Sequence, residues 1–89
     1  GMITEQEWTS FLEVVVTPRF PQGFSVLQAA GQWRSQEGAV VREASHVLQL
    51  AHTDDATSEQ AITEIIATYK TRFHQESVLR LKATLCMWY

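Results

Sequence analysis

Two arginines and a glutamate surround the short polar stretch SQEG at 35–38: Arg34 precedes it, and Arg42 and Glu43 follow it. Guanidinium groups bind carboxylates and phosphates through paired hydrogen bonds, and a nearby carboxylate can orient them. We therefore predict a candidate ligand-binding site formed by Trp33, Arg34, Arg42, Glu43 and His46. A cross-strand ion pair, contributing about 0.2–1 kcal/mol to stability, is the simpler interpretation of the charged residues.

The remaining reactive side chains do not form a recognisable catalytic set. His46 and His52 lie six residues apart in a predicted strand, roughly 20 Å at about 3.3 Å per residue, which is too far to share one metal ion. His74 and Glu76 could act as acid and base, but a polar helix end is the favoured explanation. Cys86 has no basic neighbour in the sequence and is predicted to pack as a small apolar residue. No catalytic residue, metal site or cofactor is predicted.

The elements that must position these residues begin with a helix predicted over 4–16. Thr4 and Glu7 match the T-x-x-E capping box, in which each side chain satisfies a free backbone N–H of the first turn. Pro18 ends the helix, because the residue before a proline avoids helical backbone angles. The apolar positions have helical spacing and are Trp8, Phe11, Leu12 and Val15.

A turn at 18–23, rich in proline and glycine, leads into a predicted hairpin. Its strands are expected over 24–34 and 40–52, joined by the polar stretch at 35–38. The sequence AAG at 29–31 predicts a bulge in the first strand, because glycine inside a strand is typical of such irregularities.

A second helix is predicted over 58–73, with Thr57 as its N-cap. Its apolar stripe comprises Ile62, Ile65, Ile66, Tyr69 and Phe73. From 78 to 89 apolar and polar residues alternate, which predicts a long final strand.

The order α-β-β-α-β predicts one α+β domain over 2–89, with Gly1 interpreted as a remnant of an expression tag. The nearest common architecture is the ferredoxin-like two-layer sandwich, βαββαβ, without its first strand. That strand lies centrally in the sheet. Either the last strand pairs directly with the hairpin, or a partner chain fills the space.

The composition excludes several classes of function. The chain has 89 residues, 45% hydrophobic, with a net charge of −3, so nucleic acid and anionic membranes are not expected as partners. No apolar run is long enough to span a membrane. A single cysteine and a start without a signal peptide lead us to expect a cytoplasmic protein as the chain stands. A start further upstream would make secretion or a lipid anchor the alternative.

Four short motifs give the chain a family resemblance. They are F-P-x-G at 20–23, G-x-W-R at 31–34, R-E at 42–43 and R-F-x-Q-E-S-V at 72–78. On these motifs the chain resembles the bacterial family called domain of unknown function 3574, many of whose members are predicted lipoproteins or secreted proteins. The resemblance implies an extra strand before the first helix, where this chain begins directly with the helix. It implies no activity.

Two classes of function remain open. The first is a non-catalytic binding or interaction module that works as a homodimer, with Trp88 near the centre of its interface. The second is a small-molecule enzyme of the dimeric ferredoxin-like type, with a pocket between helices and sheet lined by Trp33, Arg34, Arg42 and His46. A deep pocket holding these polar groups would favour the enzyme, and a filled core would favour the module.

Overall fold

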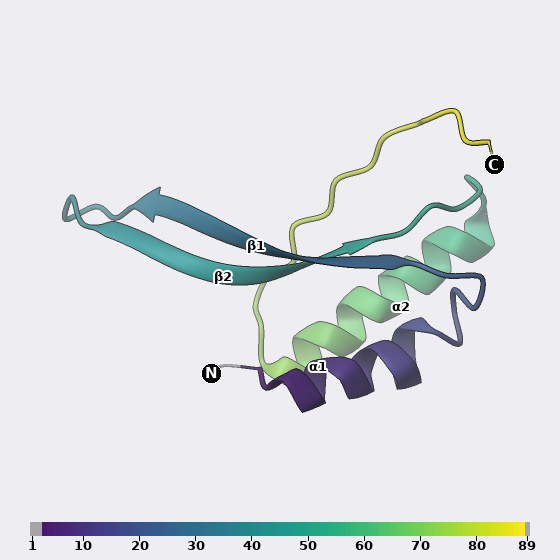
Figure 1. Ribbon diagram of the computed structural model, residues 1–89, viewed down its shortest axis with the longest axis horizontal. Helices are drawn as coiled ribbons and strands as arrows, with labels where there is room; N and C mark the ends of the chain where they lie inside the picture. The colour runs from purple at the N-terminus through teal and green to yellow at the C-terminus, as the bar shows by residue number, and fades with distance from the viewer. Residues whose placement is uncertain (1–2, 89) are drawn as a thin grey trace.

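The computed structural model describes residues 3–88 and confirms an α+β architecture (Figure 1). The elements are α1 (Glu5–Phe11), η1 (Leu12–Val16), β1 (Ser25–Arg34), β2 (Val40–Gln49) and α2 (Ala56–Phe73). The two helical segments lie on one side of a hairpin formed by β1 and β2. No helix among residues 3–88 is both long enough and apolar enough to cross a bilayer.

The predicted capping box starts α1. The backbone N–H of Glu7 donates to Thr4 Oγ1, and the N–H of Thr4 donates to Glu7 Oε1, both at 3.1 Å. After Phe11 the helix widens into the π-type turn η1, closed by a bond of 2.9 Å from Thr17 N–H to the Leu12 carbonyl. Three consecutive β-branched valines crowd an α-helical turn, and the wider turn relieves this crowding.

The segment at 18–23 is a structured turn, as predicted. The N–H groups of Arg19 and Phe20 donate to the Val16 carbonyl at 3.0 and 2.9 Å. The Arg19 side chain donates to the Val15 carbonyl at 2.9 Å, so a cation satisfies the end of the helix. Gly23, with φ of 128°, then turns the chain into β1 in a conformation that other residues rarely adopt.

The hairpin is confirmed, but its predicted details need correction. The register runs without interruption from Ser25 opposite Gln49 to Arg34 opposite Val40, so the predicted bulge at 29–31 is wrong. Gly31 takes a regular ladder position opposite Glu43. The first strand starts one residue later than predicted, and the second ends at Gln49 instead of residue 52.

The second helix is also confirmed, with a different start. Asp55 is the N-cap, and its carboxylate accepts a bond of 2.7 Å from the Ser58 N–H, so the predicted cap at Thr57 is wrong. The helix therefore begins at Ala56. It ends at Phe73, and the next residue, His74, caps it with a left-handed backbone (φ of 54°) and an N–H that donates to the Lys70 carbonyl.

The core lies between the helices and the near half of the hairpin. Its buried residues are Trp8, Phe11, Val15, Val16, Ile65 and Phe73. The Phe11 ring meets the rings of Tyr69 and Phe73 edge-on, each with a centroid separation of 5.6 Å. Phe24, Leu48 and Leu50 close this core from the hairpin side.

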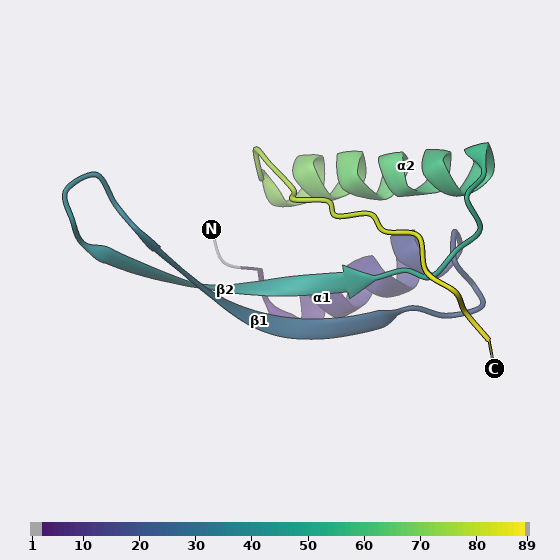
Figure 2. The same cartoon turned by 90° about the horizontal axis from the view of Figure 1, so that it is seen from above.

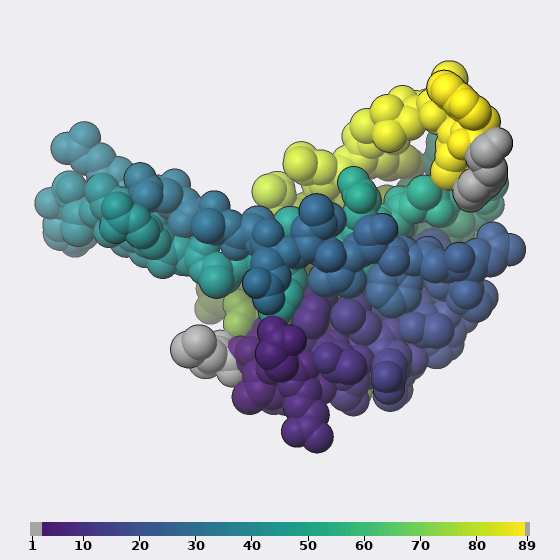
Figure 3. Space-filling model, viewed as in Figure 1, coloured from purple at the N-terminus to yellow at the C-terminus, as the bar shows by residue number. Residues whose placement is uncertain are grey.

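The far half of the hairpin extends beyond the helices as an arm, which we define as residues 30–44 (Figures 1 and 3). The radius of gyration is 14.9 Å, against about 12 Å expected for a compact domain of this length. Trp33 and Val40 in the arm are 52% and 51% exposed. The arm therefore leaves apolar side chains uncovered.

The predicted final strand over 78–89 is wrong for residues 78–88, and Tyr89 lies outside the described residues. This C-terminal segment, defined as residues 78–88, is extended but has no strand pairing; it runs on the β2 side of the hairpin (Figures 1 and 2). A strand forms only where its backbone pairs with a neighbouring strand, and β1 and β2 pair only with each other among the described residues. Cys86 is exposed, so its predicted packing is not found here. The ferredoxin-like arrangement is not confirmed.

Candidate functional site

Trp33 and Glu43 lie together on the outer face of the arm, which we define as the face turned away from the helices. The indole N–H of Trp33 donates to Glu43 Oε1 at 3.1 Å. Side chains in a strand alternate between faces, and residues directly opposite each other share one face. Gly31 is opposite Glu43, so Trp33 and Glu43 are diagonal neighbours. The bond links the two strands of the arm through their side chains.

Arg34 and Arg42 lie on the other face of the arm. The register places Gln32 opposite Arg42 and Arg34 opposite Val40, which makes the two arginines diagonal neighbours. Neither forms an ion pair with any residue between 3 and 88, so a cross-strand ion pair is the wrong interpretation of these positions. Both guanidinium groups are exposed to solvent.

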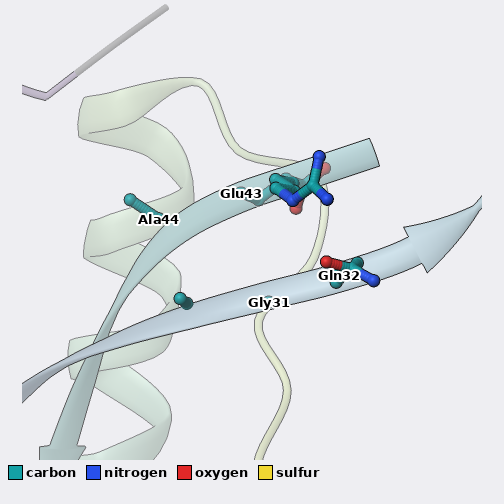
Figure 4. A pocket seen from close by; sticks show the side chains of 6 residues that line it. Gly31, Gln32, Glu43 and Ala44 are labelled. Atoms are coloured by element: carbon teal, nitrogen blue, oxygen red, sulfur yellow. The ribbon is translucent and has the colours of Figure 1, made fainter. Parts of the chain in front are cut away.

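A shallow hollow crosses the two strands of the arm (Figure 4). It is lined by Ala30, Gly31, Gln32, Arg42, Glu43 and Ala44. Ala30 and Ala44 contribute only methyl groups and Gly31 has no side chain, so part of the lining is small. Gln32 and Arg42 supply amide and guanidinium groups at its rim. The hollow is open to solvent and offers these polar groups for surface contacts.

His46 packs against the core. Its ring stacks on the Trp8 indole with a centroid separation of 4.2 Å and an angle of 15° between the planes. The side chain is half-buried. His52, six residues further along, lies past the end of β2, where Nδ1 is 2.7 Å from the Thr53 carbonyl oxygen. The two histidines belong to separate surroundings.

The five predicted site residues therefore do not converge on one point. Trp33 and Glu43 lie on the outer face, Arg34 and Arg42 lie on the opposite face, and His46 packs in the core. The enzyme hypothesis requires a pocket between helices and sheet in which Arg34 and Arg42 lie beside His46. The space between the helices and the hairpin holds the apolar core instead. A role for these residues in binding stays a prediction. Residues 3–88 hold no cluster of three potential metal ligands.

An ion-pair cluster at the start of α2 escaped the sequence analysis. Arg80 Nη1 lies 2.8 Å from Glu59 Oε2, and Lys82 Nζ lies 2.9 Å from both Glu59 Oε1 and Asp54 Oδ1. Hydrogen bonds from Arg80 and then Lys82 lower the pKa of Glu59 to about 2. The sequence contained a signal for this cluster: the basic residues Arg80 and Lys82 alternate with apolar residues, and the start of α2 is acidic, so the two segments have opposite charges.

These ion pairs orient the C-terminal segment. Arg80 and Lys82 point toward α2, and the alternation of an extended chain turns the intervening residues the other way. Leu79, Leu81 and Leu85 are 85%, 86% and 83% exposed. The segment therefore presents a row of leucines that nothing in the described chain covers.

Comparison with known proteins identifies the family of the chain but no activity. No curated protein and no solved structure matches the chain. One family model, described as "Protein of unknown function (DUF3574)", matches residues 1–89, the whole chain. This match agrees with the four motifs, two of which lie in the arm. The chain therefore belongs to the DUF3574 family, whose function is unknown.

Proposed function

We propose that the protein is a non-catalytic interaction module that works as a homodimer. The observation that carries this proposal is the C-terminal segment, which is extended, apolar on one side and uncovered. Trp88, near its end, is 82% exposed. Contiguous exposed apolar residues in a small domain are typical of an interaction surface.

The apolar area available is sufficient for a dimer. At about 25 cal/mol per Å², a leucine burial of 1.5–3 kcal/mol corresponds to roughly 60–120 Å². The three leucines then offer about 180–360 Å² per copy, and Trp88, which has the opposite parity at the end of the segment, adds roughly 150–250 Å², about 330–610 Å² together. Two copies supply about 660–1,220 Å², close to the roughly 1,000 Å² that a specific interface needs.

Two further features support the proposal. β2 pairs only with β1 in the described sheet, so its second edge keeps unpaired backbone groups that favour association. The space between helices and hairpin is filled by the aromatic and aliphatic core, which supports a module over an enzyme with an internal pocket.

Matched lysine substitutions test the proposal. Leu81→Lys places a charge in the leucine row, whereas Val14→Lys places one at an exposed position of η1, outside that row. We expect sedimentation equilibrium at micromolar concentration to give a dimer mass for the unmodified chain and for Val14→Lys, and a monomer mass for Leu81→Lys. A dimer that survives Leu81→Lys unchanged would refute the role of the segment.

A further inference from the structure

We infer, on the basis of the homodimer proposed above, that the arm of each copy packs its outer face over the C-terminal segment of the other copy. The two surfaces are the outer residues of the arm, Trp33, Val41 and Glu43, and the leucine row, Leu79, Leu81 and Leu85. Trp33 is 52% exposed, and the three leucines are 85%, 86% and 83% exposed. Each would bury the other.

The two surfaces lie toward opposite ends of the molecule. The arm projects at one end beyond the helices, and the C-terminal segment runs toward the other end, along the surface (Figures 1 and 3). A two-fold axis perpendicular to the strands places the arm of one copy at the end of the other copy where the C-terminal segment lies. It therefore brings each arm to the leucine row of its partner in two equivalent contacts, and such a two-fold arrangement closes without further copies.

The outer face of the hairpin has the chemistry needed to cover the leucine row of the other copy. Glu43 is its one charged residue between Ser25 and Gln49, and its carboxylate already accepts the Trp33 indole N–H. Leu27 and Val47 on the same face are 49% and 42% exposed. A face with a single charged residue can pack against the leucine row of the other copy without like-charge repulsion. An exposed tryptophan such as Trp33 is typical of interface centres.

The helix-facing side of the arm does not fit this role. Arg34 and Arg42 are there, without a neutralising carboxylate among the described residues. Burial of two unpaired guanidinium groups against leucines would be unfavourable. The choice of the outer face therefore follows from the alternation of side chains along the two strands.

Val40 and Val41 provide a matched pair for the test, because they are adjacent valines on opposite faces of the arm. We expect Val41→Lys to raise the dimer dissociation constant at least tenfold and Val40→Lys to change it less than threefold. Equal effects of the two substitutions would overturn the inference. If the unmodified chain is already a monomer, the homodimer itself is refuted; a dimer indifferent to Val41→Lys refutes only the arm contact.

A mixing experiment tests which surfaces meet. Val41→Lys and Leu81→Glu chains should each be monomers alone. In a mixed dimer one contact pairs the new lysine with the new glutamate, and the other keeps Val41 against Leu81. We therefore expect an equimolar mixture to recover at least half of the dimer seen for the unmodified chain. A mixture that stays monomeric would overturn the contact between arm and C-terminal segment.

Discussion

Val14 and Val16 lie two residues apart in η1 but have opposite surroundings. Val14 is 60% exposed, whereas Val16 is fully buried at 0%. Substituting each with alanine removes the same atoms from the same helical turn. The gain in helix propensity, up to about 0.5 kcal/mol, is therefore shared by both variants and cancels in their difference.

The burial of Val16 sets the magnitude of that difference. Removing two buried carbon groups costs about 1.6 kcal/mol at roughly 0.8 kcal/mol each. A residual cavity of about 40 Å³ would add about 1 kcal/mol at roughly 24 cal/mol per Å³. We expect Val16→Ala to be about 1.5–2.5 kcal/mol less stable than Val14→Ala, which itself stays within about 0.5 kcal/mol of the unmodified protein.

Urea denaturation followed by circular dichroism measures this difference. With a slope of about 1–3 kcal/mol per M, the two midpoints should differ by roughly 0.5–2.5 M. All chains must be compared at one protein concentration, because dimer formation adds to apparent stability. Midpoints that agree within the equivalent of about 0.5 kcal/mol would show that the π-type turn does not place Val16 in the core.

The remaining predictions concern the start of α2. Asp55→Ala should lower the free energy of unfolding by about 0.5–2 kcal/mol, because it removes the N-cap acceptor, whereas Thr57→Ala should cost less than about 0.5 kcal/mol; the reverse order in chemical denaturation would identify Thr57 as the cap. Glu59 has a pKa lowered from 4.5 to about 2 in the folded protein, so its ion pairs stabilise the fold fully above pH 4.5 and are lost as the pH falls through about 2. A carboxyl titration by NMR with a midpoint near 4.5 would contradict the contact with Arg80 and Lys82.

The parts of the fold that depend on local interactions could be predicted from the sequence. The capping box of Thr4 and Glu7 involves residues three apart, and the stripe containing Trp8 and Phe11 follows helical spacing. The hairpin follows from two strand-like runs and a turn at 35–38 in which Gly38 has a φ of 88°. Each of these features needs no information from distant residues.

The details that could not be predicted depend on competition between two candidate N-cap residues or on pairing with residues distant in the sequence. Asp55 and Thr57 are both good N-caps, and the extended backbone of Asp55, with φ of −139°, makes it the one that starts the helix. Alternation over 78–88 predicts an extended chain, but it does not determine whether that chain pairs with another strand. Gly31 suggested a bulge because the sequence does not show how its strand pairs. The pairing with β2 places Gly31 in a regular position opposite Glu43.

The candidate site was misjudged because residues close in sequence are not close on a strand surface. Trp33 and Arg34 are neighbours in the chain, yet they point to opposite faces, as do Arg42 and Glu43. This division could have been predicted from alternation alone. The stacking of His46 on Trp8 could not, because it depends on how α1 packs against the hairpin.

The mass of the unmodified chain in solution tests the homodimer most directly. Sedimentation equilibrium at several micromolar concentrations should give 20.2 kDa, which is twice the 10.1 kDa of one chain. The dimer mass should persist in high salt, because the proposed interface is apolar. A mass of 10.1 kDa at every concentration would contradict the account, since the leucine row and the outer face of the arm would then remain exposed in the functional protein.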